Sequence, residues 1–288
     1  MRLPPGFAKA EALELGGLIE SAYRQFDRSE DGGAWELPSG FSLLAELRYD
    51  GDPVLPGKLG AVDGYIRDVV KRFREPSDVP VGFLAVREDV LCAVFRGTRT
   101  VKEWAGNLNA RLKDFPGSPG RAHEGFLHSY GKIRPALADA VGRTGRRTRI
   151  LLAGHSLGGA MATLAAVDIE SSMGRKAAAL YTFGSPRVGD RAFAEDFRKR
   201  LGGRAFRVAN SCDLVPSLPP PAPLAHIVGG YYVHVGEPAC FTRQTEDVED
   251  NHSMAVYLEA VSKGKDARPS RGIGRRILSS LLPRIPSG

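Results

Sequence analysis

The most informative segment of this 288-residue chain is residues 150–159, where an apolar run leads directly into the pattern Gly-x-Ser-x-Gly around Ser156. When such a pattern joins a strand to a helix, the serine hydroxyl projects above the sheet, and the first N–H groups of the helix face any oxyanion that develops there. Gly154 and Gly158 remove side chains that would collide across the turn. Ser156 is therefore predicted to be a nucleophile, although a small-residue turn with a hydrogen-bonded serine has the same bare pattern.

The elements around this turn alternate between strands and helices. Apolar periodicity predicts helices within residues 15–26, 62–73 and 126–141, and the Ala-rich segment after Ser156 predicts another to about residue 172. Strand-like runs occupy residues 41–47, 81–86, 90–95, 150–153, 178–183 and 205–209. A charged turn at 87–89 predicts antiparallel pairing of the second and third runs. The later alternation predicts an α/β fold, with a mostly parallel sheet and helices on both faces.

The positive charge of the chain is concentrated at its C-terminal end. The formal net charge is +7, and residues 263–288 carry +6 of it, which leaves +1 for residues 1–262. Residues 1–262 are nearly neutral and so lack the excess positive charge that attracts nucleic-acid phosphates. No nucleic-acid partner is therefore expected. The chain is 42% hydrophobic and 25% charged, which is typical of a globular protein. Residues 1–262 are predicted to form a single domain, followed by a basic tail.

Two interpretations of the tail at 263–288 stay open. Four apolar residues at helical spacing stand beside arginines, which favours weak docking on an anionic membrane; they are Ile273, Ile277, Leu278 and Leu281. Two glycines and a proline in the same stretch favour a flexible, solubilising tail instead.

The cysteines and the N-terminal segment bear on the cellular compartment. Cys92, Cys212 and Cys240 are odd in number and have no paired spacing, so they are expected to be reduced and mostly buried. The sequence has no recognisable signal peptide or transmembrane segment, which predicts a cytoplasmic protein, with export by another route left open.

Six short motifs in one order resemble the fungal-type (class 3) lipases of the α/β-hydrolase superfamily over about residues 81–261. They are Phe-Arg-Gly-Thr at 95–98, His-Glu-Gly-Phe at 123–126 with Ser-Tyr at 129–130, Gly-His-Ser-Leu-Gly-Gly at 154–159, Gly-Ser-Pro-Arg-Val-Gly-Asp at 184–190, Asp-Leu-Val-Pro at 213–216 with Leu-Pro-Pro at 218–220, and Asp-Asn-His at 250–252 followed by Tyr257. Each motif alone is modest, but their order is a strong signal. The resemblance implies an α/β-hydrolase fold and a Ser-His-Asp acyl-enzyme mechanism without metal or cofactor.

The resemblance places the catalytic histidine at His252, which follows an acidic, turn-like stretch and begins an apolar-periodic helix. The chain order Ser…Asp…His then confines the acid to residues between the nucleophile and the base. Asp213 is preferred because it comes just after the strand at 205–209, and open α/β sheets keep their sites at the carboxyl ends of strands. Asp247 and Asp250 remain the alternatives.

Other polar residues of these motifs are expected to be structural. His155 and His123 occupy positions that the family uses structurally, and His234 alternates with an aromatic residue, which predicts a packed histidine in a strand. Asp190 is expected to cap the helix that follows it.

The resemblance assigns the oxyanion hole to the backbone N–H groups of Thr98, helped by its hydroxyl, and of Leu157. Loss of such a donor usually costs a factor of about 10²–10³ in rate. A strand-ending threonine with a local hydrogen bond is the alternative for Thr98. Residues 99–108 match the family's lid, whose apolar members here include Val101, Trp104 and Leu108. Polar neighbours and a glycine dilute this apolar face, which favours an esterase with little interfacial activation.

The leading hypothesis is a serine carboxylic-ester hydrolase, a triacylglycerol lipase or esterase that acts on a lipid or a small ester. A phospholipase or an acyltransferase of the same fold is an alternative within this class. The alternative from another class is a non-catalytic lipid- or membrane-binding protein, which the presence of candidates for all three triad members disfavours.

Overall fold

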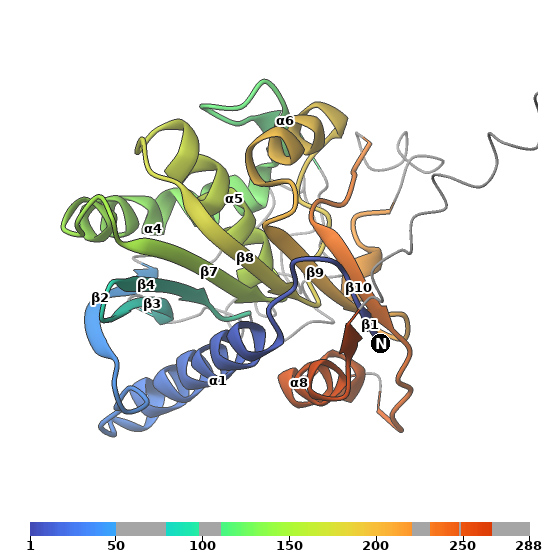
Figure 1. Cartoon of the computed structure of the whole chain (residues 1–288), viewed down its shortest axis with the longest axis horizontal. Helices are drawn as coiled ribbons and strands as arrows, with labels where there is room; N and C mark the ends of the chain where they lie inside the picture. Colours follow the sequence, from blue (N-terminus) through green and yellow to red (C-terminus); the bar gives the residue numbers. More distant parts are fainter. Residues whose placement is uncertain (50–78, 98–110, 221–230, 248, 267–288) are drawn as a thin grey trace, which may run out of the picture.

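The structure is a computed structural model that describes residues 1–49, 79–97, 111–220, 231–247 and 249–266 (Figure 1). A seven-stranded sheet in the order β10-β9-β8-β7-β4-β3-β2 forms its centre. The strands are β2 (Ser42–Tyr49), β3 (Val79–Arg87), β4 (Val90–Phe95), β7 (Arg149–His155), β8 (Ala177–Phe183), β9 (Ala205–Asn210) and β10 (Glu237–Phe241). β2, β3 and β4 pair antiparallel, and β4, β7, β8, β9 and β10 run parallel. The predicted, mostly parallel sheet with antiparallel early strands is confirmed.

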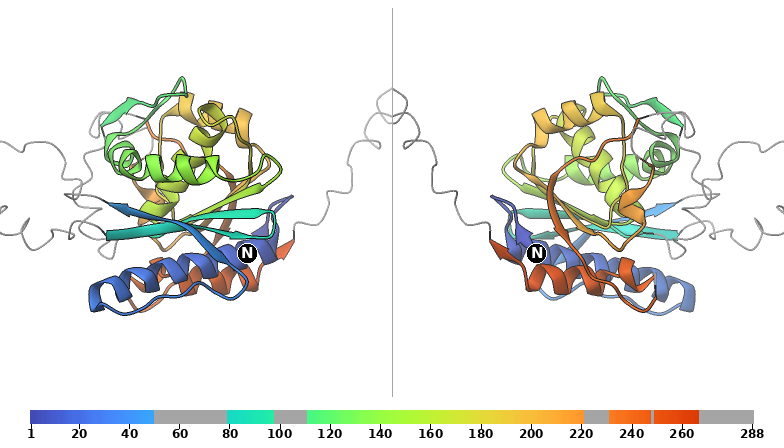
Figure 2. Two further views of the ribbon diagram at one scale, coloured as in Figure 1. Left: turned by 90° about the vertical axis from the view of Figure 1, so that its left-hand side faces the viewer. Right: turned by 90° about the vertical axis from the view of Figure 1, so that its right-hand side faces the viewer.

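Helices cover both faces of this sheet, as predicted (Figure 2). One face carries α4 (Glu124–Gly142), α5 (Leu157–Ser171) and α6 (Arg191–Leu201), and the other carries α1 (Lys9–Asp31) and α8 (Met254–Ser262). Two hydrophobic clusters result, one on each side of the sheet. The predicted helix at 62–73 lies outside the described residues.

The burial of each element explains whether its sequence is a continuous apolar run or shows apolar periodicity. β7 lies in the middle of the sheet and is buried from Ile150 to His155, so its sequence is a continuous apolar run. α5 is also buried along almost its whole length, because it packs against the sheet and against α4. By contrast, α1 buries one face only, with Leu15, Leu18 and Ile19 on it, and therefore shows helical periodicity.

Short elements complete the fold. The hairpin of β5 (Leu112–Asp114) and β6 (Arg121–His123) leads into α4. β1 (Arg2–Leu3) pairs in parallel with β11 (Lys265–Asp266), and the Lys265 N–H donates to the carbonyl of Met1. The fold therefore extends four residues past the predicted boundary at 262, because basic composition marks the tail but does not reveal main-chain pairing. Residues 267–288 of the predicted tail lie outside the described residues.

The cysteines only partly match the expectation. All three are free thiols, but only Cys92 is buried, whereas Cys212 is half-buried and Cys240 is exposed. The expectation of mostly buried thiols is thus wrong for two of them. Cys240 lies on β10, the last strand at one edge of the described sheet, and the sequence pattern does not predict this strand because it is short and begins with Glu237 and Pro238.

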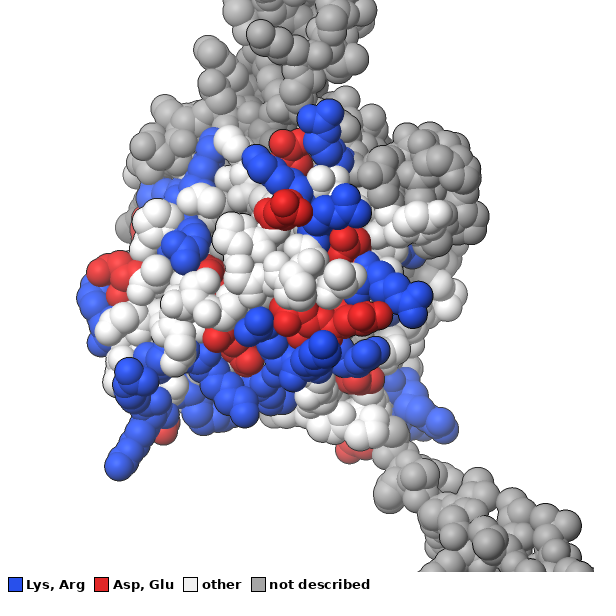
Figure 3. Space-filling model, turned by 90° about the horizontal axis from the view of Figure 1, so that it is seen from above, with Lys and Arg blue, Asp and Glu red and all other residues white. Residues whose placement is uncertain are grey.

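Charged side chains of both signs lie next to each other on the face seen in Figure 3, and Lys and Arg gather along one edge of it. On α6, Arg191 pairs with Glu195 and Arg200 pairs with Asp196, each at i,i+4 spacing. Such surface pairs add little to stability, but they offset part of the positive charge. Among the helices that the structure describes, none combines the length and the apolar character needed to cross a membrane.

Candidate active site

Ser156 stands at the sharp turn between β7, which ends at His155, and α5, which begins at Leu157. Its φ of 56° and ψ of −128° are unusual for a residue with a side chain, and the residue is buried. Backbone strain of this kind persists only where the surrounding structure imposes it, and it concentrates at functional sites. A Cβ on Gly154 would collide with the carbonyl oxygen of Gly158, so close packing across the turn requires the first glycine of the pattern.

The carboxylate of Asp213, three residues beyond the end of β9, is held by three donors. Its Oδ1 accepts the Val215 N–H at 2.9 Å. Its Oδ2 accepts from Nδ1 of His252 at 2.5 Å and from the hydroxyl of Tyr257 at 2.6 Å. Asp213 is 3% exposed, and hydrogen bonds to a carboxylate are stronger than those between neutral groups. The acid candidate is therefore fixed in one orientation toward the ring of His252.

His252 is the histidine whose ring meets this carboxylate. Because Nδ1 donates to Asp213, Nε2 is the ring nitrogen that can accept a proton. This Nε2 atom is buried and has no hydrogen-bond partner among the described residues. The carbonyl oxygen of His252 lies 2.8 Å from Nε2 of His155, the residue directly before Ser156. The candidate base and the candidate nucleophile thus lie on segments that are hydrogen-bonded to each other.

The end of β8 contacts both of these segments. The Ser156 N–H donates to the carbonyl of Phe183 at 3.0 Å. The next residue, Gly184, has a φ of 57°, and a Cβ there would lie 3.0 Å from Cε1 of His252 and 3.1 Å from Oδ2 of Asp213. Both the left-handed backbone and the lack of space therefore favour glycine at this position.

His123 and Asp190 cap helices, and the prediction for Asp190 is confirmed. Nδ1 of His123 accepts the Phe126 N–H at 3.3 Å at the start of α4. Oδ1 of Asp190 accepts the Phe193 N–H at 2.9 Å at the start of α6. Burial lowers the pKa of His123 to about 4, so its ring is neutral at physiological pH.

The remaining candidates are His234, Asp247 and Asp250. Nε2 of His234 donates to the carbonyl of Pro216 at 2.7 Å, and burial lowers its pKa to about 3. His234 is packed as predicted but lies beside an isolated bridge rather than in a strand. Asp247 and Asp250 are exposed, and the carboxylate bonded to the His252 ring belongs to Asp213. The geometry therefore favours Asp213 as the acid.

The predicted oxyanion donors are only partly within the described residues. Leu157 is the first residue of α5, and the first N–H groups of a helix have no partner within it. The positive end of the α5 dipole therefore faces the surroundings of Ser156. Thr98 and the predicted lid residues Val101, Trp104 and Leu108 lie outside the described residues.

Tyr257 is a site residue whose role the sequence pattern does not reveal. It lies on α8, five residues after His252, and is fully buried. Its hydroxyl donates to the same Asp213 oxygen that accepts from His252, and it accepts the Asn210 N–H at 3.3 Å. Burial raises its pKa well above the usual range, so the hydroxyl keeps its proton. A tyrosine one and a half turns after a candidate catalytic histidine is the signal that could have indicated it.

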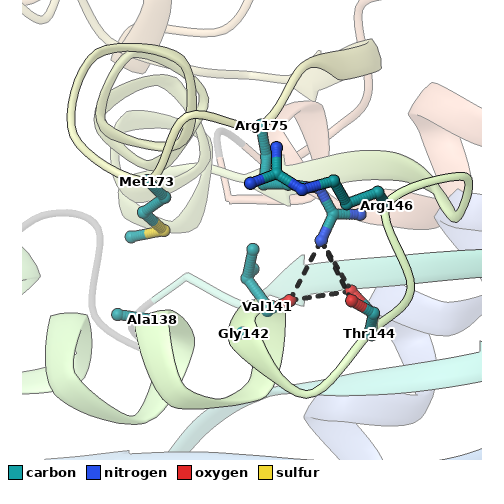
Figure 4. Close-up of a pocket in the computed structure, with 7 residues that line it drawn as sticks. All are labelled: Ala138, Val141, Gly142, Thr144, Arg146, Met173 and Arg175. Atoms are coloured by element: carbon teal, nitrogen blue, oxygen red, sulfur yellow. Dashed lines mark hydrogen bonds between the residues drawn. The ribbon is translucent and has the colours of Figure 1, made fainter.

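A cavity of about 360 Å³ lies away from this site, between the end of α4 and the loop after α5 (Figure 4). Arg175 lines it and donates to the carbonyl oxygens of Val141 and Thr144, both at 3.2 Å. These residues lie near the amino ends of β7 and β8, whereas Ser156 and Asp213 follow the carboxyl ends of β7 and β9. This cavity is therefore separate from the candidate active site.

Comparison with known proteins identifies the family. The family model described as "Lipase (class 3)" matches residues 92–222. Phospholipase A1 EG1 of Oryza sativa subsp. indica is 31% identical over 326 residues, and the match covers 93% of this chain and 72% of that protein. The chain belongs to the class 3 lipase family. The resemblance predicted from the six motifs is thereby confirmed.

A second curated relative and a solved structure are also similar to this chain. A lipase of Rhizomucor miehei is 34% identical over 170 residues, which covers 56% of this chain and 47% of that protein. The chain thus spans about half the length of the first curated relatives that it matches. The crystal structure of a lipase from Rhizopus microsporus var. chinensis matches with a TM-score of 0.58 at 22% identity, covering 83% of this chain and 77% of that chain. The chain has the α/β-hydrolase fold.

Proposed function

We propose that this class 3 lipase is a serine carboxylic-ester hydrolase in which Ser156, His252 and Asp213 form the catalytic triad. One observation carries the proposal. Nδ1 of His252 is fixed on Asp213, whereas its Nε2 is buried without a partner among the described residues, on a segment bonded to the residue before Ser156. A ring held in this way can take the serine proton only through Nε2, as general-base catalysis by a triad requires.

In the proposed mechanism, the hydroxyl oxygen of Ser156 attacks the carbonyl carbon of the ester while its proton moves to Nε2 of His252. Asp213 stabilises the imidazolium that forms. The Leu157 N–H stabilises the negative charge on the former carbonyl oxygen, with Thr98 as the proposed second donor. Nε2 then protonates the leaving alcohol, and the acyl group stays on Ser156. A water molecule activated by His252 releases the carboxylic acid and restores the serine hydroxyl.

The proposed substrates are acylglycerols or simpler carboxylic esters, with phospholipids as a second class. The Rhizomucor relative is named a lipase, and the Oryza relative, which covers nearly all of this chain, is named a phospholipase A1. The narrow apolar face expected for the lid, with Val101, Trp104 and Leu108, favours dissolved short-chain esters and a small rate increase at an oil surface.

Steady-state hydrolysis of three substrates tests this function: dissolved p-nitrophenyl butyrate, emulsified triolein, and phosphatidylcholine vesicles. We expect turnover of the dissolved ester, and in Ser156→Ala a loss of up to about 10⁶ in kcat. Ser262→Ala is the matched control, because the exposed Ser262 hydroxyl donates to the carbonyl of Glu259 near the end of α8. We expect this control to keep wild-type activity.

Three results would contradict parts of this proposal. Full turnover by Ser156→Ala would move the nucleophile elsewhere. No turnover of any ester by the wild-type protein would favour a non-catalytic lipid-binding protein. A rate that rises sharply only once an emulsion forms would indicate a firmly closing lid and a true lipase.

The basic tail supports a separate proposal of weak contact with anionic membranes. Because Lys265 and Asp266 belong to β11, a chain ending at Asp266 removes residues 267–288 and keeps every helix and strand that the structure describes. We expect this chain to keep its ester hydrolysis but to bind phosphatidylserine vesicles less well at low salt, where attraction is least screened. Equal binding by both chains would remove the membrane role. A cytoplasmic location stays a prediction.

A further inference from the structure

The hydroxyl of Tyr23 contacts two segments of the proposed site, although Tyr23 belongs to α1, outside the residues that match the family model. Its oxygen is 2.9 Å from the backbone nitrogen of Gly97 and 2.7 Å from Nδ1 of His155. Gly97 follows the end of β4 and precedes the proposed oxyanion donor, and His155 directly precedes Ser156. One tyrosine therefore joins the strand that leads to the oxyanion hole and the nucleophile turn.

Chemistry determines the direction of every hydrogen bond in this network. Nε2 of His155 lies 2.8 Å from the carbonyl oxygen of His252, which can only accept, so Nε2 carries a proton. Burial and the neighbouring His252 hold the pKa of His155 well below its usual value, so the ring is neutral and Nδ1 accepts. Burial raises the pKa of Tyr23 to about 12, so its hydroxyl keeps the proton that it donates to Nδ1. The Gly97 N–H in turn donates to this hydroxyl oxygen.

A second residue of α1, Phe26, contacts Gly97 indirectly, through Arg96. Nη1 of Arg96 donates to the Gly97 carbonyl at 2.7 Å, and the guanidinium carbon lies 3.8 Å from the ring centre of Phe26, one turn after Tyr23. Because a peptide bond is planar, fixing the Gly97 carbonyl fixes the plane of the peptide bond that joins Gly97 to Thr98. The proposed oxyanion donor belongs to this peptide bond.

Close packing makes this arrangement sensitive to small shifts. A Cβ on Gly97 would lie 2.6 Å from Cβ of Ser156 and 2.8 Å from the Tyr23 hydroxyl, both shorter than real contacts of a Cβ. Gly97 therefore packs closely against both the nucleophile and the tyrosine. We expect a displacement of Gly97 to shift Ser156.

We propose that Tyr23 is a positioning residue of the ester-hydrolysing site. Its hydroxyl holds the end of β4, the nucleophile turn and the backbone of His252 in the geometry that attack on an ester requires. The inference rests on the proposed function of Ser156 and His252. Tyr23 positions the backbone around the reacting groups and is not itself proposed to touch them. Loss of its hydroxyl should therefore lower kcat and leave KM nearly unchanged.

Tyr23→Phe removes the hydroxyl and keeps the ring. We expect kcat for p-nitrophenyl butyrate to fall roughly tenfold, with KM within about twofold of wild type, because small displacements of catalytic groups slow the reaction without removing substrate contacts. Tyr181→Phe is the matched control. The buried Tyr181 hydroxyl also anchors α1, since it accepts the Ala8 N–H at 3.3 Å and donates to Glu11 at 3.0 Å. Both variants should lose similar thermal stability, but Tyr181→Phe should keep its kcat.

A second measurement does not depend on activity. In ¹⁵N spectra of histidine-labelled protein, the Nδ1 signal of His155 should move downfield in Tyr23→Phe, because this nitrogen loses its hydrogen-bond donor. The same signal should stay unchanged in Tyr181→Phe.

The outcomes distinguish a positioning role of Tyr23 from a merely structural role and from failure of the proposed function. Equal losses of kcat in the two variants would reduce Tyr23 to a structural role, and wild-type kcat in Tyr23→Phe would overturn the proposal. If the wild-type protein hydrolyses no ester, the proposed function fails instead. Whether or not the protein hydrolyses esters, an unchanged His155 Nδ1 signal in Tyr23→Phe would overturn the hydrogen bond from Tyr23 to His155.

Discussion

Gly184 offers a direct perturbation of the proposed acid–base geometry, because one added methyl group there would contact three site residues. In Gly184→Ala the new Cβ would lie 3.0 Å from Cε1 of His252, 3.0 Å from the Tyr257 hydroxyl and 3.1 Å from Oδ2 of Asp213. Ordinary contacts of a Cβ begin at 3.4 Å, so these atoms must move by a few tenths of an ångström. A displacement of 1 Å costs about 10²-fold in rate, so we expect kcat for p-nitrophenyl butyrate to fall roughly tenfold.

The backbone at Gly184 adds a stability effect that needs its own control. With a φ of 57°, an alanine there is strained by about 1–2 kcal/mol. Gly174→Ala carries the same strain at a φ of 61°, but nothing lies within 4 Å of the added Cβ. Both variants should therefore melt at lower temperature, by about 2–4 °C for each kcal/mol, while only Gly184→Ala loses kcat. An equal loss of kcat in Gly174→Ala, or none in Gly184→Ala, would refute the reasoning.

Three further predictions follow from the contacts. Asp213→Asn should lower kcat by about 10⁴, because a neutral amide neither stabilises the imidazolium nor holds the His252 ring in the required tautomer, whereas Asp190→Ala should lower the melting temperature through loss of a helix cap worth about 1 kcal/mol. Asp168→Ala removes a buried carboxylate that accepts from the buried Tyr130 hydroxyl at 2.7 Å and pairs at 2.8 Å with Arg134, whose side chain is 46% exposed; it should destabilise the fold by about 2–3 kcal/mol in urea unfolding, with kcat unchanged. Because burial lowers the folded-state pKa of His123 to about 4, the unfolded chain binds a proton at this residue below about pH 6.5 that the folded chain does not bind. His123 should therefore contribute a stability loss of up to about 1.4 kcal/mol per pH unit as the pH is lowered from 6.5 to 4, beside the contributions of the buried His155 and His234. His123→Gln should make the slope of stability against pH shallower by the share of His123.

The elements that carry the site could be predicted from the sequence because their signals are local. The apolar run of β7, the glycines around Ser156 and the Ala-rich α5 are consecutive in the chain, and the close contact between Gly154 and Gly158 explains why the pattern needs them. Asp213 could be preferred over its alternatives because it follows the carboxyl end of β9. Each inference depends on a few neighbouring residues.

The residues that support the site could not be predicted in the same way. Tyr23 is 132 positions away from His155, and the periodicity of α1 indicates a buried face but not the partner of a hydroxyl on it. Tyr257 meets Asp213 across 44 positions. Such contacts depend on how elements distant in sequence pack together, which local patterns do not encode.

The most direct test of the proposed triad is covalent labelling with a fluorophosphonate, followed by mass spectrometry of the labelled peptides. We expect a single adduct on Ser156, and we expect labelling to become very slow in His252→Ala because no base takes the serine proton. His234→Ala should label at the wild-type rate, since His234 bonds to the carbonyl of Pro216 instead. An adduct on another serine, or labelling of Ser156 at the wild-type rate in His252→Ala, would contradict the account.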